Sequence, residues 1–169
     1  MDALDYVEDQ ARRNVAFRLE TRELLHKRAT QLCLLLLGAG GAIAAWSLEK
    51  IGVSISAGAV ALLSVAAWLF VVSGWVAARC LPTAEAMPPG NEPGNLLLYL
   101  DKKKQAGASD AQALEETRRA ELDALQKRIK GYAAVNQNAA MRLDLAYKAA
   151  TMSPIIGLIA LGVSSYLLG

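Results

Sequence analysis

Six arginines are the residues of this chain best suited to bind phosphate: Arg12, Arg13, Arg18, Arg22, Arg118 and Arg119. A guanidinium group presents a planar fork of N–H donors that matches the oxygens of a phosphate. The first four recur at helical spacing, so a single helix would carry all of them. We expect a phosphate-binding collar where several subunits bring these arginines together.

The same basic residues also have a simpler interpretation. Lysines and arginines that flank a membrane are attracted to anionic lipid head groups, with about 1 kcal/mol for each residue near the surface. They also fix the orientation of the spans, because cytoplasmic segments carry an excess of positive charge. From the sequence alone, both interpretations stay open.

A second set of polar residues lies in or beside stretches that contain no charge. These pore-lining candidates are Thr30, Gln31, Ser54, Ser56, Ser64, Thr151 and Ser153. A single hydroxyl in a helix usually bonds its own backbone, whereas a row of polar residues on assembled helices can line a water-filled pore. One chain has too few spans to enclose a wide pore. A pore therefore requires a homo-oligomer of cyclic symmetry, and we expect four subunits.

Signals of enzyme chemistry are absent from the sequence. It contains no Gly-rich phosphate loop, no H-E-x-x-H and no serine elbow. His26 is the single histidine, and Cys33 and Cys80 do not form a CxxC pair, so we expect no metal site. We therefore expect a protein that is not an enzyme and needs no cofactor.

Three stretches without charge must position these residues: Ala29–Leu48, Ile51–Ala78 and Ala149–Gly169. Each has about the 20 residues or more that an α-helix needs to cross the hydrocarbon core of a bilayer. We predict an all-α membrane protein with three transmembrane helices and long cytoplasmic helical extensions, assembled as a homo-oligomeric bundle. All but Lys50 of the 18 basic residues fall on one side if the N-terminus is cytoplasmic and the C-terminus periplasmic.

Composition divides the chain into four consecutive segments. Residues 1–28 form an N-terminal cytoplasmic helix, and residues 29–79 form a transmembrane hairpin that turns at Glu49–Lys50. Residues 80–148 form a cytoplasmic region, and residues 149–169 form the third span. Within the cytoplasmic region, Leu81–Asn95 is rich in Pro and Gly and is predicted to be a loop. A short helix over Leu96–Lys104 follows, and Ser109 with Gln112 predicts a capping box that begins a long helix.

The long helix carries a heptad pattern. One row comprises Leu122, Ile129, Asn136 and Leu143, and the other comprises Leu125, Tyr132, Ala139 and Ala146. This spacing is typical of a coiled coil, and a polar Asn in the seam fixes the register of the helices that pack there. We expect Leu122, Leu125, Ile129, Tyr132 and Asn136 to form a seam between subunits.

The pattern up to Cys80 resembles the SLATT-type membrane effectors of bacterial anti-phage systems. The resemblance lies in a basic helix, with the run Ala11-Arg12-Arg13-Asn14-Val15-Ala16-Phe17-Arg18, that leads into two spans joined by a tight hairpin. The added helix and third span look like the nucleotide-linked effectors of the Hailong type. This resemblance implies an effector in the bacterial inner membrane, paired with a nucleotidyltransferase whose product regulates it.

Three functions follow from these observations. The first is a nucleotide-regulated ion channel or membrane-disrupting pore of anti-phage defence, as the resemblance implies. The second is a non-conducting scaffold that recruits partners through its cytoplasmic helices. The third is a phage holin, although holins usually lack such a large cytoplasmic helical region.

Overall fold

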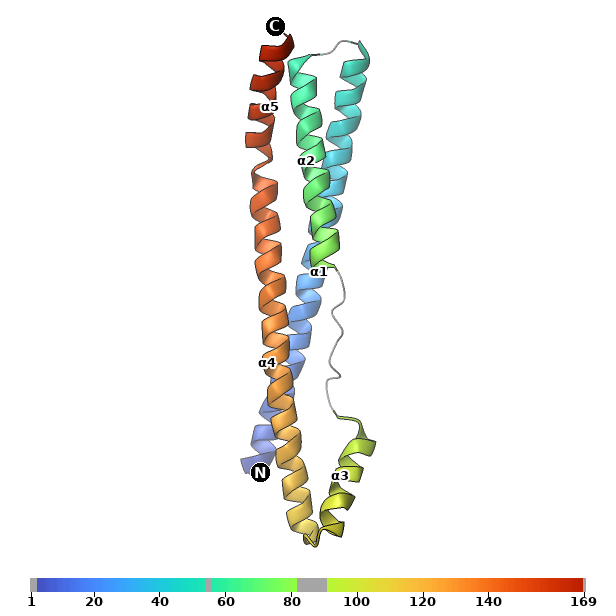
Figure 1. Cartoon of the computed structure of the whole chain (residues 1–169), viewed down its shortest axis with the longest axis vertical. Helices are drawn as coiled ribbons and strands as arrows, with labels where there is room; N and C mark the ends of the chain where they lie inside the picture. The colour runs from blue at the N-terminus through green and yellow to red at the C-terminus, as the bar shows by residue number, and fades with distance from the viewer. Residues whose placement is uncertain (1–2, 54–55, 82–90, 169) are drawn as a thin grey trace. The chain divides into compact units, whose positions relative to one another are not determined.

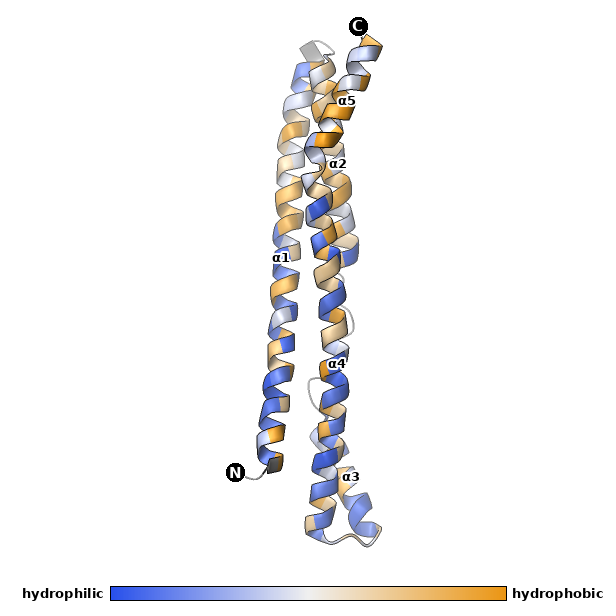
Figure 2. Ribbon diagram, turned by 90° about the vertical axis from the view of Figure 1, so that its left-hand side faces the viewer, coloured by the Kyte–Doolittle hydropathy of each residue, from blue (hydrophilic) through white to orange (hydrophobic). Residues whose placement is uncertain are grey.

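The computed structural model describes residues 3–53, 56–81 and 91–168, and every secondary-structure element in these ranges is an α-helix (Figure 1). The helices are α1 (Ala3–Val53), α2 (Ala57–Cys80), α3 (Pro93–Gln105), α4 (Asp110–Thr151) and α5 (Ser153–Leu168). The predicted all-α class is confirmed. Three helical stretches are long and apolar enough to cross a membrane. Figure 2 shows the apolar residues concentrated on α2, on α5 and on the C-terminal part of α1.

The chain divides into two compact units, each made of segments that are far apart in the sequence. Unit 1 comprises Met1–Glu23 and Thr83–Gln137, and unit 2 comprises Leu24–Pro82 and Asn138–Gly169. Composition along the chain predicts four consecutive segments. In the structure, the N-terminal helical segment packs with the predicted cytoplasmic region as unit 1, and the predicted hairpin packs with the third span as unit 2. Because α1 and α4 are continuous helices, each contributes residues to both units.

Helix α1 extends beyond the point where the sequence predicts a turn. The predicted position of the hairpin turn at Glu49–Lys50 is wrong, because both residues lie in α1, which ends at Val53. The two charges end the apolar stretch, but Glu and Lys are good helix formers and do not interrupt backbone hydrogen bonding. Ser54, one of the pore-lining candidates, lies outside the described residues.

At each end of α2, a side chain forms a hydrogen bond with a backbone group of the helix. At its N-terminus the amide of Ala59 donates to Ser56 Oγ at 3.2 Å, so Ser56 acts as the N-cap. At its C-terminus Arg142 Nη1 donates to the carbonyl of Arg79 at 3.0 Å. The last carbonyls of a helix have no partner within that helix, so α4 supplies a donor that α2 lacks.

Helix α3 begins earlier than predicted. The sequence predicts a loop through Asn95, whereas α3 begins at Pro93. Proline fits the first helical position, where its missing N–H is not needed and its φ angle is already helical. The short helix predicted over Leu96–Lys104 is confirmed as part of α3. Residues 82–90, in the same predicted loop, lie outside the described residues.

The turn from α3 to α4 follows the sequence closely. Gly107 has a φ of +91°, and the amide of Ala108 donates to the carbonyl of Lys103 at 3.2 Å, which closes a Schellman motif. The predicted capping box is confirmed. The amide of Ser109 donates to Gln112 Oε1 at 3.2 Å, and the amide of Gln112 donates to Ser109 Oγ at 3.4 Å.

A break separates α4 from α5 near Pro154. Proline has no N–H to donate, so the helix cannot keep its regular pattern of hydrogen bonds through this residue. The carbonyl of Ala149 accepts from the amide of Met152 at 3.2 Å and from the indole Nε1 of Trp68 at 2.9 Å. The Ala149 carbonyl therefore has one partner in its own helix and a second partner, Trp68, on α2, which links α2 to the chain beside the break.

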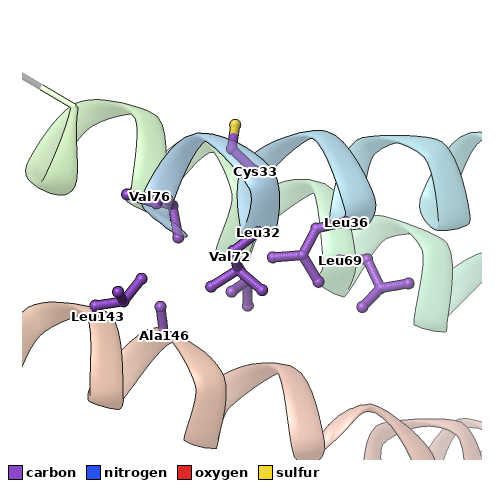
Figure 3. Packing of buried hydrophobic residues seen from close by; sticks show 9 residues of the cluster. Leu32, Cys33, Leu36, Leu69, Val72, Val76, Leu143 and Ala146 are labelled. Atoms are coloured by element: carbon purple, nitrogen blue, oxygen red, sulfur yellow. The ribbon is translucent and has the colours of Figure 1, made fainter. Parts of the chain in front are cut away.

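The core of unit 2 brings side chains from three helices together, as Figure 3 shows. It consists of Ala29, Leu32, Cys33 and Leu36 from α1, Leu69, Val72 and Val76 from α2, and Leu143 and Ala146 from α4. Two glycines bring further helices close to α2. A Cβ at Gly40 would lie 3.3 Å from Phe70 Cε1, and one at Gly157 would lie 3.0 Å from Val65 Cγ2. Small residues at these positions therefore permit close helix packing.

Unit 1 has a smaller core between α1 and α4. Val15 of α1 packs with Leu125 and Tyr132 of α4, and all three are buried. Ala11, Leu19 and Ile129 cover this cluster as partly buried neighbours. The core therefore rests on one apolar stripe of each helix.

Candidate functional site

The best-defined polar contact in unit 1 joins Arg118 of α4 to two acids of α1. Arg118 Nε donates to Glu8 Oε1 at 2.7 Å, and its Nη2 donates to Asp5 Oδ1 at 2.6 Å. Glu8 and Asp5 lie one helical turn apart, so one guanidinium reaches both carboxylates. The hydrogen bond that Arg118 donates to Glu8, followed by the one that it donates to Asp5, raises the pKa of Arg118 above its ordinary value. We call this group the Arg118 clamp.

The other five candidate arginines lie in different surroundings. Arg13 pairs with Asp9 at 2.8 Å, and Arg119 pairs with Glu115 at 2.6 Å; both are exposed pairs within one helix. Arg18 and Arg22 are half-buried. Arg12 is exposed, and no ion pair to it is found in the part of the chain that the structure describes.

One chain does not gather these arginines around a common point. The clamp pairs Arg118 with acids, so a phosphate could reach that guanidinium only by displacing Asp5 and Glu8. Exposed ion pairs within a helix contribute little, about 0.3–0.5 kcal/mol, so Arg13 can exchange its partner readily. Arg12, one turn after Glu8 on α1, and Arg13 are thus the candidates most open to an anion.

A buried polar contact links Arg18 to the seam residue Asn136. Asn136 Nδ2 donates to the backbone carbonyl of Arg18 at 2.8 Å, and Asn136 is only 5% exposed. A buried polar side chain that bonds the facing helix permits one register and disfavours others. Asn136 therefore has a hydrogen-bond partner on α1 of the same chain, and its role in fixing the register of the seam stays a prediction.

The seam predicted on α4 faces α1 within one chain. Leu125, Tyr132 and Asn136 are buried, and Leu122 and Ile129 are half-buried. The heptad spacing identifies the apolar stripe of α4 correctly, and the stripe packs with Val15. Contact of these five residues between subunits stays a prediction, since one chain already covers much of their surface.

A second polar cluster in unit 1 has no signal in the sequence. Arg128 Nη2 donates to Asn91 Oδ1 at 2.5 Å, and Arg128 Nη1 lies 3.6 Å from Glu121 Oε1. Asn91 Nδ2 also donates to Glu121. Glu121 and Arg128 are two turns apart on α4, but Asn91 lies in the predicted loop, and no local pattern marks it. The cluster ties the segment before α3 to α4.

Two lysines of α3 extend this attachment to the start of α4. Lys103 Nζ lies 2.7 Å from Glu116 Oε2, and Lys104 Nζ lies 3.0 Å from Asp110 Oδ1. The hydrogen bond with Glu116 is the largest cause that raises the pKa of Lys103. These basic residues therefore serve a structural contact in this chain.

Three of the seven pore-lining candidates donate a hydrogen bond to a carbonyl of their own helix. Thr30, Ser64 and Thr151 donate to the carbonyls of His26, Val60 and Lys148 at 3.0, 3.0 and 2.8 Å. Ser56 is the N-cap of α2, and Ser153 is half-buried. Gln31 is exposed, and its amide has no hydrogen-bond partner among the residues described. Gln31 is therefore the candidate with most free hydrogen-bonding capacity.

Two buried residues of unit 2 form a polar contact that the candidate set did not include. Ser73 Oγ donates to the carbonyl of Cys33 at 3.1 Å, and Cys33 Sγ lies 3.2 Å from Ser73 Oγ. Both residues are buried between α1 and α2. Hydrogen bonds between helices in a membrane contribute about 0.6 kcal/mol on average, so this contact adds specificity to the packing.

No protein-family model, no curated protein and no solved structure matches this chain.

Proposed function

We propose that this protein is a membrane effector of anti-phage defence that assembles into a homo-oligomeric ion channel or membrane-disrupting pore. Its regulator is a nucleotide or DNA oligomer made by a companion nucleotidyltransferase. The effector role comes from the resemblance of the first 80 residues to SLATT-type proteins. The N-terminus lies in the cytoplasm and the C-terminus at the periplasmic face of the inner membrane, and reporter fusions at Gly107 and Gly169 test this orientation.

One observation carries the regulatory part of the proposal. Helices α1 and α4 each belong to the charged unit 1 and to the apolar unit 2 without a break between them. A change in the packing of unit 1 therefore acts on the spans through continuous helices. An anion that binds Arg12 and Arg13, or displaces the acids of the Arg118 clamp, changes the contact between α1 and α4.

The size of such an effect follows from linkage. A ligand shifts a conformational equilibrium only by its difference in affinity for the two states. A coupling of about 3 kcal/mol, at the upper end of the usual range, changes the open fraction by about a hundredfold. A hundredfold change in the open fraction is sufficient to change a pore that is closed in most copies into one that conducts.

A scaffold that does not conduct is the second candidate. The exposed Leu97 and Leu98 of α3 favour it, because at 60% and 70% exposure they offer an apolar contact outside the spans. Conductance separates the two functions, since a scaffold leaves the membrane potential unchanged.

Expression of the chain without its companion enzyme tests the proposal in cells. Toxicity with loss of membrane potential, read by a potential-sensitive dye, means that the ligand holds the pore shut. Silence until the companion enzyme is added means that the ligand opens it. If the potential and dye entry stay unchanged under both conditions, the channel is excluded and the scaffold replaces it.

Paired charge reversals test whether the response to the companion enzyme depends on Arg12 and Arg13 or on the positive charge of unit 1 in general. We expect Arg12→Glu with Arg13→Glu to change the response to the companion enzyme without changing membrane insertion. Lys127→Glu with Lys130→Glu is the matched control, because both lysines are exposed in unit 1 and give the same change in net charge. Equal responses in the two variants would assign the effect to charge in general.

A further inference from the structure

The end of α4 and the whole of α5 form two helical halves that meet at a break. Pro154 has no N–H, so the carbonyl of Ala150 lacks the donor that a continuous helix would supply four residues later. The amide of Ile155 instead donates to the carbonyl of Met152 at 3.0 Å. The helical hydrogen-bond pattern is therefore interrupted at Met152, and the angle between α4 and α5 is held less firmly than either helix itself.

The half before the break is firmly attached to α2. Leu143 and Ala146 of α4 lie in the unit 2 core with Val72 of α2 (Figure 3). The indole Nε1 of Trp68 donates to the carbonyl of Ala149, and no second acceptor for it is found in the described part of the chain. Trp68 lies near the middle of the apolar helix α2. Lipid tails accept no hydrogen bond, so separating this turn from α2 would leave the indole N–H without a partner.

The half after the break is held to α2 by a polar contact that can open at little cost. Ser164 is the single buried residue of α5 among those that the structure describes. Its Oγ lies 3.3 Å from the carbonyl of Ala57, and it also donates to the carbonyl of Ala160 in its own helix. Ala57 begins α2, so its carbonyl keeps its helical partner when Ser164 moves away. Opening this contact therefore leaves no polar group unpaired.

The apolar contact between α5 and α2 is also replaceable in a bilayer. Gly157 lies close to Val65, where a Cβ on the glycine would meet Val65 Cγ2 at 3.0 Å. Lipid tails are as apolar as these side chains, so lipid can take the place of the contact without exposing apolar surface to water. Segments with few buried contacts move most readily. Movement of α5 is thus easier than movement of the end of α4.

We propose that α5 is a hinged segment that pivots at Met152 between a closed position on α2, seen in the structure, and an open position away from it. Trp68 holds the turn before the pivot, and Ser164 forms the releasable contact beyond it. All of these residues belong to unit 2, so the motion needs no change in unit 1. A ligand or a change in the bilayer can shift such an equilibrium. The hinge goes beyond the proposed pore and does not depend on its ligand.

Distances between pairs of spin labels, measured by electron paramagnetic resonance in liposomes, test the hinge. In a chain with Cys33→Ala and Cys80→Ala, labelled cysteines replace Val71 of α2 and either Leu145 before the break or Leu167 after it. These three positions are exposed. The labelled chain is diluted with an excess of unlabelled chain, so that each distance lies within one subunit. We expect one narrow distance for Val71–Leu145 and two distances for Val71–Leu167.

Two substitutions separate the pivot from the releasable contact. Ser164→Ala should raise the ratio of open to closed molecules about threefold, the effect of one average hydrogen bond between membrane helices. Ser165→Ala, at the exposed neighbouring serine, should leave the ratio unchanged. Pro154→Ala supplies the missing amide, so one Val71–Leu167 distance should remain.

Three results contradict the hinge. The first is a single Val71–Leu167 distance in both the wild type and Ser164→Ala. The second is a Val71–Leu145 distance that divides in the same way as the Val71–Leu167 distance, because the half before the break would then move as well. The third is a pair of Val71–Leu167 distances that persists in Pro154→Ala, because the motion would then not depend on the break.

Discussion

Replacing Leu125 by Ala is expected to destabilise unit 1 by about 2–5 kcal/mol, the usual cost of truncating a buried leucine. Leu125 is 4% exposed and packs with Val15 and Tyr132, so the smaller side chain leaves a cavity in a small core. Hydrogen exchange measures the result: amides of α1 and α4 in unit 1 should lose protection.

Leu114→Ala is the control, because Leu114 lies on the same helix but is 53% exposed. Its effect should stay within about 0.5 kcal/mol, as for most surface substitutions. Equal losses of protection in the two variants would mean that the α4 stripe does not pack as described.

Replacing Gly157 by Leu is expected to separate α5 from α2. A Cβ at this position would already lie 3.0 Å from Val65 Cγ2, and leucine adds three more carbons. Overpacking costs about 1–3 kcal/mol in a well-packed core. The thermal midpoint of the protein in detergent should fall.

Gly162→Leu provides the comparison within α5, because a Cβ at Gly162 meets no described atom within 4 Å. This variant should unfold close to the wild-type temperature. A similar fall in both midpoints would indicate that leucine disturbs α5 in itself, and not its contact with α2.

Local signals in the sequence predicted the helices well. The charge-free stretches identified the spans because length and hydropathy alone decide whether a helix suits a bilayer. Ser109 and Gln112 predicted the start of α4 because a capping box acts over three residues. The predicted turn at Glu49–Lys50 failed because charge marks the edge of an apolar stretch but does not end a helix.

Local patterns in the sequence did not predict which distant segments contact each other. A heptad pattern identifies the stripe of α4 that packs, but it does not say whether the partner is α1 of the same chain or another subunit. The pairing of Arg118 with Glu8 and Asp5 joins residues more than 100 positions apart, and no local spacing reveals it. The contact of Trp68 with Ala149 likewise depends on how α2 meets the third span.

Ion flux through liposomes that contain only the purified protein tests the proposed pore most directly. The vesicles enclose an ion-sensitive dye, and flux is measured before and after adding a mixture of nucleotides and short DNA oligomers. We expect flux in at least one of the two conditions. Protein that is oligomeric by native mass spectrometry yet gives no flux in either condition, together with an unchanged membrane potential in cells, would contradict the proposed pore.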